Sequence, residues 1–233
     1  MNRYYTRACN FYYGSNSKTL VKKKKALPLN GNSDISFDKL EIISRKSKKI
    51  IDLNDIYKLS TNLKKKVKKD IKLITNSKKN IKNLNFKSIP KIMGVLNVTP
   101  DSFSDGGKYV KIDYAKKHLD FLFKCGADLV DIGGESTRPG SQPVSSKVEW
   151  DRIKDILKKI DKKKLISLDT RKSDIMEKGI KLGVYLINDI SGLEYDNKSV
   201  DILKKYKIPF VLQHSLGNPD VMQKSPKYHN VLL

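Results

Sequence analysis

The sequence NVTPDSFSDGG occupies residues 97–107, directly after a short apolar run that begins at Ile92. The sequence GGESTRPG, residues 133–140, follows a second short run, Leu129–Asp131, in the same way. Both segments are polar and rich in glycine, as loops that leave strands often are. In an α/β barrel the loops at the carboxyl ends of the strands carry the active site. The two segments together predict such a face.

Two further segments fit the same plan: LISLDT at residues 165–170 and NDISG at residues 188–192. Apolar residues repeat at helical spacing within 114–123 and 153–160, and short strands are expected at 129–132, 165–169, 185–189 and 209–213. Strands that alternate with helices predict a parallel sheet. This periodicity alone does not distinguish a barrel from a doubly wound sheet.

The four segments resemble, in order and spacing, the signature motifs of dihydropteroate synthase, an enzyme of folate biosynthesis. The resemblance runs from about Lys91 to the C-terminus, so we expect a pterin-binding domain at 91–233 and a Lys-rich extension and linker at 1–90. It implies an α/β fold of the (β/α)8 TIM-barrel type, incomplete here, with about five of the eight β/α units. The implied reaction condenses p-aminobenzoate with 6-hydroxymethyl-7,8-dihydropterin diphosphate and releases pyrophosphate.

The loop residues suit the two anionic substrates that this reaction requires. Arg138 offers a planar donor fork beside backbone N–H groups, which is chemistry for an oxyanion or a carboxylate. In the resembled family the equivalent loop contacts the diphosphate and p-aminobenzoate, which implies substrate-binding roles for Thr137, Arg138 and Pro139. Asp105 is the candidate for a lid carboxylate that meets positive charge developing on the pterin methylene. Asp105 and Arg138 are therefore the predicted catalytic residues.

Three residues at strand ends complete the predicted site. Asp169 and Asn188 end successive strands, and a carboxylate with a carboxamide can read the adjacent N–H donors and ring acceptor of a pterin edge. The family's pterin-binding residues match these two positions. Asn97 has an amide oxygen suited to Mg²⁺, which often bridges to phosphates with few protein contacts. The family's metal-binding asparagine matches Asn97, so Mg²⁺ is the expected cofactor.

The sequence after the fifth expected strand lacks the later segments of the family. No Asp-Pro-Gly strand, Ser-Arg-Lys segment or Arg-x-His ending occurs before Leu233. We therefore expect a C-terminally truncated barrel that is inactive alone, and a homodimer for the complete barrel. A barrel without about three of its eight strands exposes two parallel edges.

The formal net charge of +23 is concentrated in the first 90 residues, which hold 23 Lys and Arg against 6 Asp and Glu. Most of the basic residues are lysine rather than the arginine that nucleic-acid sites favour, so the excess indicates solvated surface rather than a nucleic-acid partner. A small α+β extension is expected there. Its elements are a strand at 8–13, a helix at 17–26, a strand at 35–43 and an exposed helix at about 56–74.

The remaining features favour a cytoplasmic protein with no membrane partner. No apolar run approaches the length of a membrane span, and the N-terminus has no signal-peptide core. The two cysteines have no metal-type spacing. Two alternatives remain open at this point. One is a pterin-dependent methyltransferase, and the other is a non-catalytic fragment with a basic nucleic-acid-binding extension.

Overall fold

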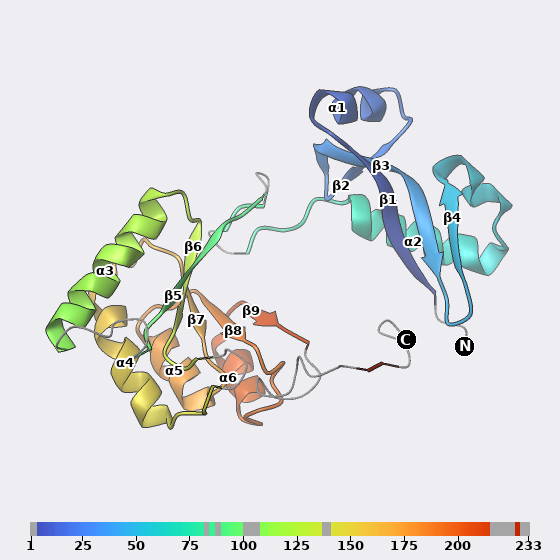
Figure 1. The fold of residues 1–233 in the computed structure, drawn as a ribbon. Helices are drawn as coiled ribbons and strands as arrows, with labels where there is room; N and C mark the ends of the chain where they lie inside the picture. The colour runs from blue at the N-terminus through green and yellow to red at the C-terminus, as the bar shows by residue number, and fades with distance from the viewer. Residues whose placement is uncertain are drawn as a thin grey trace. The chain divides into compact units, whose positions relative to one another are not determined.

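A computed structural model of the chain divides into two compact units, one formed mainly by residues 1–89 and the other by residues 90–227 (Figure 1). The structure describes residues 4–81, 84–86, 90–99, 108–136, 141–214 and 227–228. Within these ranges, no helix combines the length and the apolar character that crossing a bilayer requires.

The second unit is built on a five-stranded sheet in which every neighbouring pair of strands is parallel. The strands lie in chain order: β5 (Met93–Asn97), β6 (Leu129–Gly133), β7 (Ile166–Asp169), β8 (Leu186–Asp189) and β9 (Phe210–Leu212). Between them in sequence come α3 (Lys108–Lys124), α4 (Ser146–Lys159), α5 (Ser173–Lys181) and α6 (Ser199–Tyr206). The predicted strand–helix alternation is confirmed.

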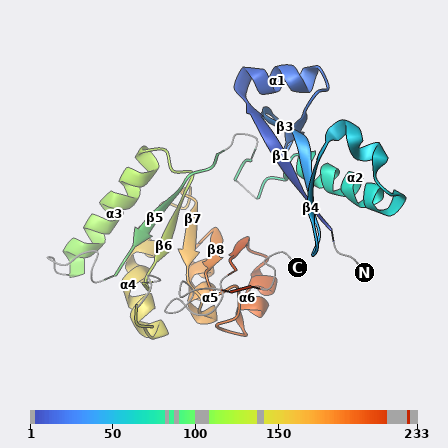
Figure 2. The same ribbon diagram turned by 45° about the vertical axis from the view of Figure 1, so that its right-hand side comes forward.

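In the described part of the unit, the helices cover one face of this sheet (Figure 2). Leu96, Ile132, Leu168 and Ile187 are in register across four strands and are buried in a single apolar core. The helices contribute buried residues to the same core, among them Ala115, Ile153, Ile175 and Leu203. A doubly wound sheet carries helices on both faces, whereas a barrel wall carries them only outside. The arrangement therefore fits the predicted incomplete barrel.

Helix α4 shows how the local sequence sets these elements. The Ser145 side chain caps the helix by accepting a hydrogen bond of 3.3 Å from the Val148 backbone N–H. Ile153, Ile156 and Leu157 share one face of the helix and are buried. Burial of one such side chain contributes about 1.5–3 kcal/mol. The helical stripe predicted over 153–160 is confirmed.

The first unit is a small antiparallel α+β fold centred on the long strand β3 (Asn32–Ile43), as expected for the extension. Strand β3 pairs with β1 (Tyr5–Tyr13) on one side and with β2 (Leu27–Leu29) and β4 (Lys48–Asp52) on the other. Three helical segments complete the unit: α1 (Gly14–Lys22), the 3-10 helix η1 (Leu53–Lys58) and α2 (Thr61–Thr75). Its core comprises Phe37, Leu40, Ile42, Ile51 and Val67.

Two sequence-based expectations for this unit, which concern its helices, were wrong in detail. The helix predicted to begin near Ile56 begins at Thr61, and it is not simply exposed, because Val67 is fully buried against the sheet. The helix predicted to reach Ala26 ends at Lys22, and Lys24 has a φ of 55°, which a continuing helix does not allow. Strand β4 was missed, because a short Lys-rich edge strand has little apolar alternation.

Candidate active site

Four strand ends form a polar row on the side of the sheet away from the helices. Asn97, Gly133, Asp169 and Asn188 are successive cross-strand partners at the carboxyl ends of β5, β6, β7 and β8. Side chains alternate along a strand, so this row points away from the apolar core that the preceding residues form. In a barrel this is the interior face, at the mouth where active sites lie.

Gly133 leaves a space in the middle of the row. A Cβ atom built on Gly133 would lie 3.3 Å from Asp169 Oδ2 and 3.5 Å from Asn97 Oδ1. The oxygens of Asn97 and Asp169, which come from the strands on either side, therefore both border the space above the glycine. A larger residue would fill the space that both oxygens border.

A second layer of polar side chains lies directly beneath this row. Asp131 is two residues before Gly133 on the same face of β6, and its register partner on β7 is the buried Ser167. The Asn188 side chain donates a hydrogen bond from Nδ2 to Asp131 Oδ2 at 2.9 Å. Burial raises the pKa of Asp131, while the donors on Ser167 and Asn188 favour its charged form. Asp131 is thus a buried acceptor that supports the site from below.

The Asp169 carboxyl is the most strongly perturbed acid of the site. Burial raises its pKa to about 8, and the nearby acidic side chains of Asp131, Glu149, Asp189 and Glu135 add to the shift. At neutral pH the free protein therefore keeps Asp169 largely protonated. A strongly shifted pKa at the mouth of a barrel is a mark of a functional site.

A buried ion cluster ties together the segments that follow β6 and β7. Arg171 donates to Glu135 through Nε and Nη2 at 3.1 and 3.2 Å, and Lys172 Nζ donates to Glu135 at 3.0 Å. Lys172 also pairs with Glu149 of α4 at 2.5 Å. The backbone N–H of Val144 donates to Glu135 at 2.9 Å. All four charged side chains are at most 8% exposed.

These contacts hold Glu135 in its charged form. Burial acts to raise the pKa of Glu135, but the hydrogen bonds from Arg171, Val144 and Lys172 outweigh it and lower the pKa below its ordinary value. The Arg171 guanidinium also lies 3.9 Å from the centre of the Tyr195 ring. The cluster therefore joins three strand-end segments into one support for the site.

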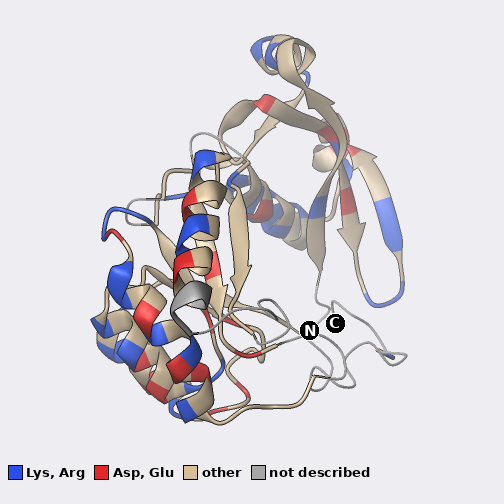
Figure 3. Ribbon diagram, turned by 60° about the vertical axis from the view of Figure 1, so that its left-hand side comes forward, with Lys and Arg blue, Asp and Glu red and all other residues tan. Residues whose placement is uncertain are grey.

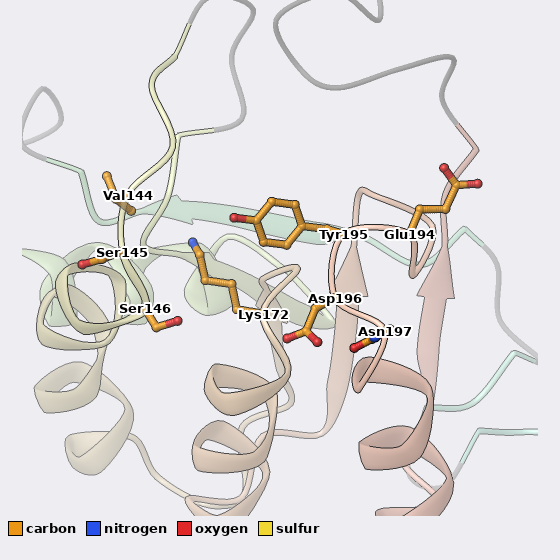
Figure 4. A pocket seen from close by; sticks show the side chains of 8 residues that line it. All are labelled: Val144, Ser145, Ser146, Lys172, Glu194, Tyr195, Asp196 and Asn197. Carbon is orange, nitrogen blue, oxygen red and sulfur yellow. The ribbon is translucent and has the colours of Figure 1, made fainter.

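A polar cavity of about 720 Å³ lies beside this cluster (Figure 4). In the figure Lys172 lies between the Val144–Ser146 segment and the segment that carries Tyr195 and Asp196. The lining residues are Val144, Ser145, Ser146, Lys172, Glu194, Tyr195, Asp196 and Asn197. They come from the connections after β6, β7 and β8, and they do not include Asn97, Asp169 or Asn188. The cavity is therefore separate from the polar row.

The outer helices of this unit carry interleaved charges of both signs (Figure 3). Many of these charges pair within a helix or with its neighbour, as Lys116 does with Asp120 and Lys178 with Asp174. Glu177 accepts from both Lys205 and Tyr206, and the Lys205 hydrogen bond is the main cause that lowers its pKa to about 2. These faces have the pattern of solvated helix surfaces.

The structure brings together the three predicted site residues that it describes: Asn97, Asp169 and Asn188. The predicted residues Asp105, Thr137, Arg138 and Pro139 lie outside the described ranges. Asp169 ends β7 and does not cap the following helix α5, whose Ser173 backbone N–H donates to Asp196.

Four residues of this region were not predicted from the sequence: Asp131, Glu135, Arg171 and Lys172. Asp131 could have been predicted from the sequence, because side chains alternate along a strand and this places Asp131 on the same face as Gly133. Asp189, the neighbour of Asn188, is fully buried, and its Oδ1 accepts hydrogen bonds from the backbone and side chain of Ser191. Asp189 therefore shapes the turn after β8.

A one-sided parallel β/α sheet with a polar row at its strand ends defines a protein of the TIM-barrel class. The family described as "Pterin binding enzyme" matches residues 93–233, and the chain belongs to that family. The match covers the sheet, the polar row and the buried ion cluster.

Similar proteins are consistent with this assignment. The dihydropteroate synthase of Escherichia coli K12 is 40% identical over 146 residues, which are 62% of this chain and 51% of that protein. The solved Xanthomonas albilineans dihydropteroate synthase with 4-aminobenzoic acid is 37% identical, with a TM-score of 0.53 over 60% of this chain and 49% of that one. The Anaplasma phagocytophilum dihydropteroate synthase with bound 6-hydroxymethylpterin-monophosphate is 39% identical. Its TM-score is 0.52, over 58% of this chain and 52% of that one. The chain spans about half the length of these relatives.

Proposed function

We propose that residues 93–233 are the pterin-binding part of a dihydropteroate synthase. In the proposed reaction the C–O bond between the pterin methylene and the diphosphate breaks, and a C–N bond forms to the amine of p-aminobenzoate. Pyrophosphate leaves, and the amine loses a proton to solvent. The observation that carries the proposal is the row in which Asn97 and Asp169 border the space over Gly133, with Asn188 beside Asp169.

Asp169 and Asn188 are the proposed pterin-binding residues. A pterin edge presents adjacent N–H donors, and the oxygens of a carboxylate and a carboxamide can accept them. Pairing with two N–H donors favours the charged form of Asp169, so ligand binding lowers the pKa from its value of about 8 in the free protein. Pterin binding near neutral pH therefore releases a proton from Asp169.

Asn97 is the proposed protein ligand of Mg²⁺. The described residues hold no group of three His, Cys, Asp or Glu side chains that could bind a metal ion by themselves. This fits Mg²⁺, which often takes one or two protein oxygens and completes its shell with phosphate oxygens and water. When bound, the ion would supply electrostatic stabilisation of the leaving diphosphate. Asn97 Oδ1 is the oxygen that would hold it.

The loop residues keep their predicted roles as part of this proposal. Arg138, with Thr137 and Pro139, would bind the diphosphate and p-aminobenzoate, and Asp105 would place a carboxylate near the pterin methylene. The buried Glu135 cluster supports this assignment, since the hydrogen bond from the Val144 backbone N–H to Glu135 joins the two segments that flank residues 137–140. We further propose that the complete barrel forms a homodimer, which sedimentation velocity would test.

The first test is binding of 6-hydroxymethylpterin monophosphate to the chain, measured by titration calorimetry. We expect Asp169→Ala and Asn188→Ala to weaken binding at least about tenfold each, because each removes a hydrogen bond partly shielded from water. Asp174→Ala is the matched control, because Asp174 lies on the outer face of α5 and pairs with Lys178. Equal affinity for all four proteins would overturn the proposed site.

The second test addresses the reaction itself. The chain completed with the C-terminal half of the E. coli relative is supplied with dihydropterin diphosphate, p-aminobenzoate and Mg²⁺. Formation of dihydropteroate that stops when p-aminobenzoate is left out supports the synthase. Pterin binding without this product, together with methyl transfer from a methylated pterin, would instead identify a pterin-dependent methyltransferase.

A further inference from the structure

Asn188 contacts a residue that lies two strands away in the sheet. Its Nδ2 donates to Asp131 Oδ2 at 2.9 Å, and β7 runs between the two strands that carry these residues. Ser167, the buried register partner of Asp131, lies on this intervening strand. Asp131 itself is 5% exposed, so the hydrogen bond is largely shielded from water.

The chemistry of this contact fixes the direction of the amide. The ionised form of Asp131, which the hydrogen bond from Asn188 favours, can only accept hydrogen bonds, whereas a carboxamide donates through nitrogen and accepts through oxygen. Asn188 must therefore turn its nitrogen toward Asp131, and its Oδ1 is directed away from that contact. Asn188 is only partly buried, beside Asp169 in the polar row at the strand ends.

We propose that Asp131 is a positioning residue that locks the Asn188 carboxamide with its oxygen available to accept from a bound pterin. The inference rests on the proposed pterin-binding function. It favours an N–H donor on the ligand edge at Asn188 and Asp169, because Asp131 holds one Nδ2 proton and keeps the amide oxygen on the opposite side; the second Nδ2 proton takes no part in this contact. Asp131 thereby sets specificity without touching the ligand.

Three isosteric variants test whether Asp131 fixes the orientation of the Asn188 amide. Asp131→Asn gives Asn188 a partner that can donate or accept, so both orientations of the amide become accessible. Asn188→Asp opposes two carboxylates, which disfavours the contact. The variant that combines Asp131→Asn with Asn188→Asp restores one donor and one acceptor with the direction of the hydrogen bond reversed. A carboxylate oxygen of the substituted side chain at position 188 is then again free to accept from the ligand.

Affinity for 6-hydroxymethylpterin monophosphate is the first readout. We expect each single variant to bind about tenfold more weakly, the scale of one lost oriented hydrogen bond, and the combined variant to recover most of that loss. A merely structural role for Asp131 predicts losses that add up in the combined variant. Wild-type affinity in Asp131→Asn, or additive losses, would overturn the proposal. Thermal unfolding of each variant checks that the fold is retained.

The side-chain amide of Asn188, observed by ¹⁵N NMR in the protein without ligand, is the second readout. The hydrogen bond to Asp131 predicts slowed exchange of one Nδ2 proton, and Asp131→Asn should remove or shift this signal. If the wild-type chain binds no pterin, the proposed function fails, while the NMR result still decides the orientation. Rapid exchange of both Nδ2 protons of Asn188 in the wild-type protein would contradict the proposed fixed orientation of the amide.

Discussion

Arg171 and Glu135 form a buried ion pair with two hydrogen bonds of 3.1 and 3.2 Å. The pair joins the segment after β7 to the segment after β6, and Lys172 adds a second cation to the same carboxylate. A buried charge that loses its partner is costly, because neither water nor another group replaces the contact. The position of Glu135 is therefore important for both stability and site geometry.

Glu135→Gln should destabilise the second unit strongly. The substitution keeps the shape of the side chain but leaves Arg171 and Lys172 buried with one anion fewer, which typically costs about 3–5 kcal/mol. Urea denaturation followed by tryptophan fluorescence of Trp150 measures the change. Glu177→Gln on α5 is the matched control, because its ion pair with Lys205 lies at the surface. Indistinguishable midpoints for the two variants would contradict a structural role for the cluster.

Gly133→Ala should weaken ligand binding while leaving the fold in place. The added methyl group would lie 3.3 Å from Asp169 Oδ2 and 3.5 Å from Asn97 Oδ1, in the space between them. We expect affinity for 6-hydroxymethylpterin monophosphate to fall about tenfold or more, since small misplacements of binding groups are costly. Calorimetric titration measures this.

Gly94→Ala provides the control for the preceding variant. Its methyl group would also meet a neighbour at 3.3 Å, but that neighbour is Leu122 of α3, on the helix-covered face of the sheet. The packing disturbance is therefore similar, and only the face differs. An equal loss of affinity in both variants would mean that general loosening of the sheet, rather than the space above Gly133, explains the effect.

The polar row could be predicted from the sequence because each member ends a short apolar run. Asn97, Asp169 and Asn188 were found in this way, and the parallel register places them side by side. The contact between Asn188 and Asp131 could not be predicted, because it crosses an intervening strand. Local patterns locate strand ends, whereas such contacts arise only from the assembled sheet.

The same distinction applies to the rest of the fold. Apolar spacing located the α4 stripe, but it did not show that the helices cover one face of the sheet only. The buried cluster around Glu135 was also missed, because buried ions look like surface charges in a sequence until their partners are known. In the first unit, the Lys-rich composition of α2 concealed the burial of Val67.

The stability of the protein should depend on pH through Asp169. Its pKa is about 8 in the folded chain and near the ordinary value of 3.8 when unfolded, so the folded state holds the proton more tightly. Stability is therefore greatest below about pH 4 for this group and is lost as pH rises toward 8, with a slope of at most about 1.4 kcal/mol per pH unit.

Asp169→Asn isolates this contribution from that of other groups. The amide cannot ionise, so the variant should lose less stability than the wild type between pH 5 and pH 8. The denaturation midpoints of both proteins, measured at each pH, give the comparison. Asp131, whose charge helps to raise the pKa of Asp169, is coupled to it, so the difference between the two proteins includes the loss of this coupling. Parallel pH profiles for the two proteins would show that Asp169 titrates normally in the folded chain.

Burial, rather than side-chain size, should govern the effect of substitutions in α2 of the first unit. Val67 is fully buried, whereas Leu73 on the same helix is 59% exposed. We expect Val67→Ala to cost about 1–3 kcal/mol, because it leaves a cavity beneath the sheet. Leu73→Ala removes more atoms but should cost only about 0.5 kcal/mol, since most of that side chain is already in water. Denaturation followed by circular dichroism on residues 1–90 and on the whole chain gives the comparison. Equal effects of the two variants would indicate that α2 does not pack on the sheet, and a larger effect for Leu73→Ala would reverse the assignment of its buried face.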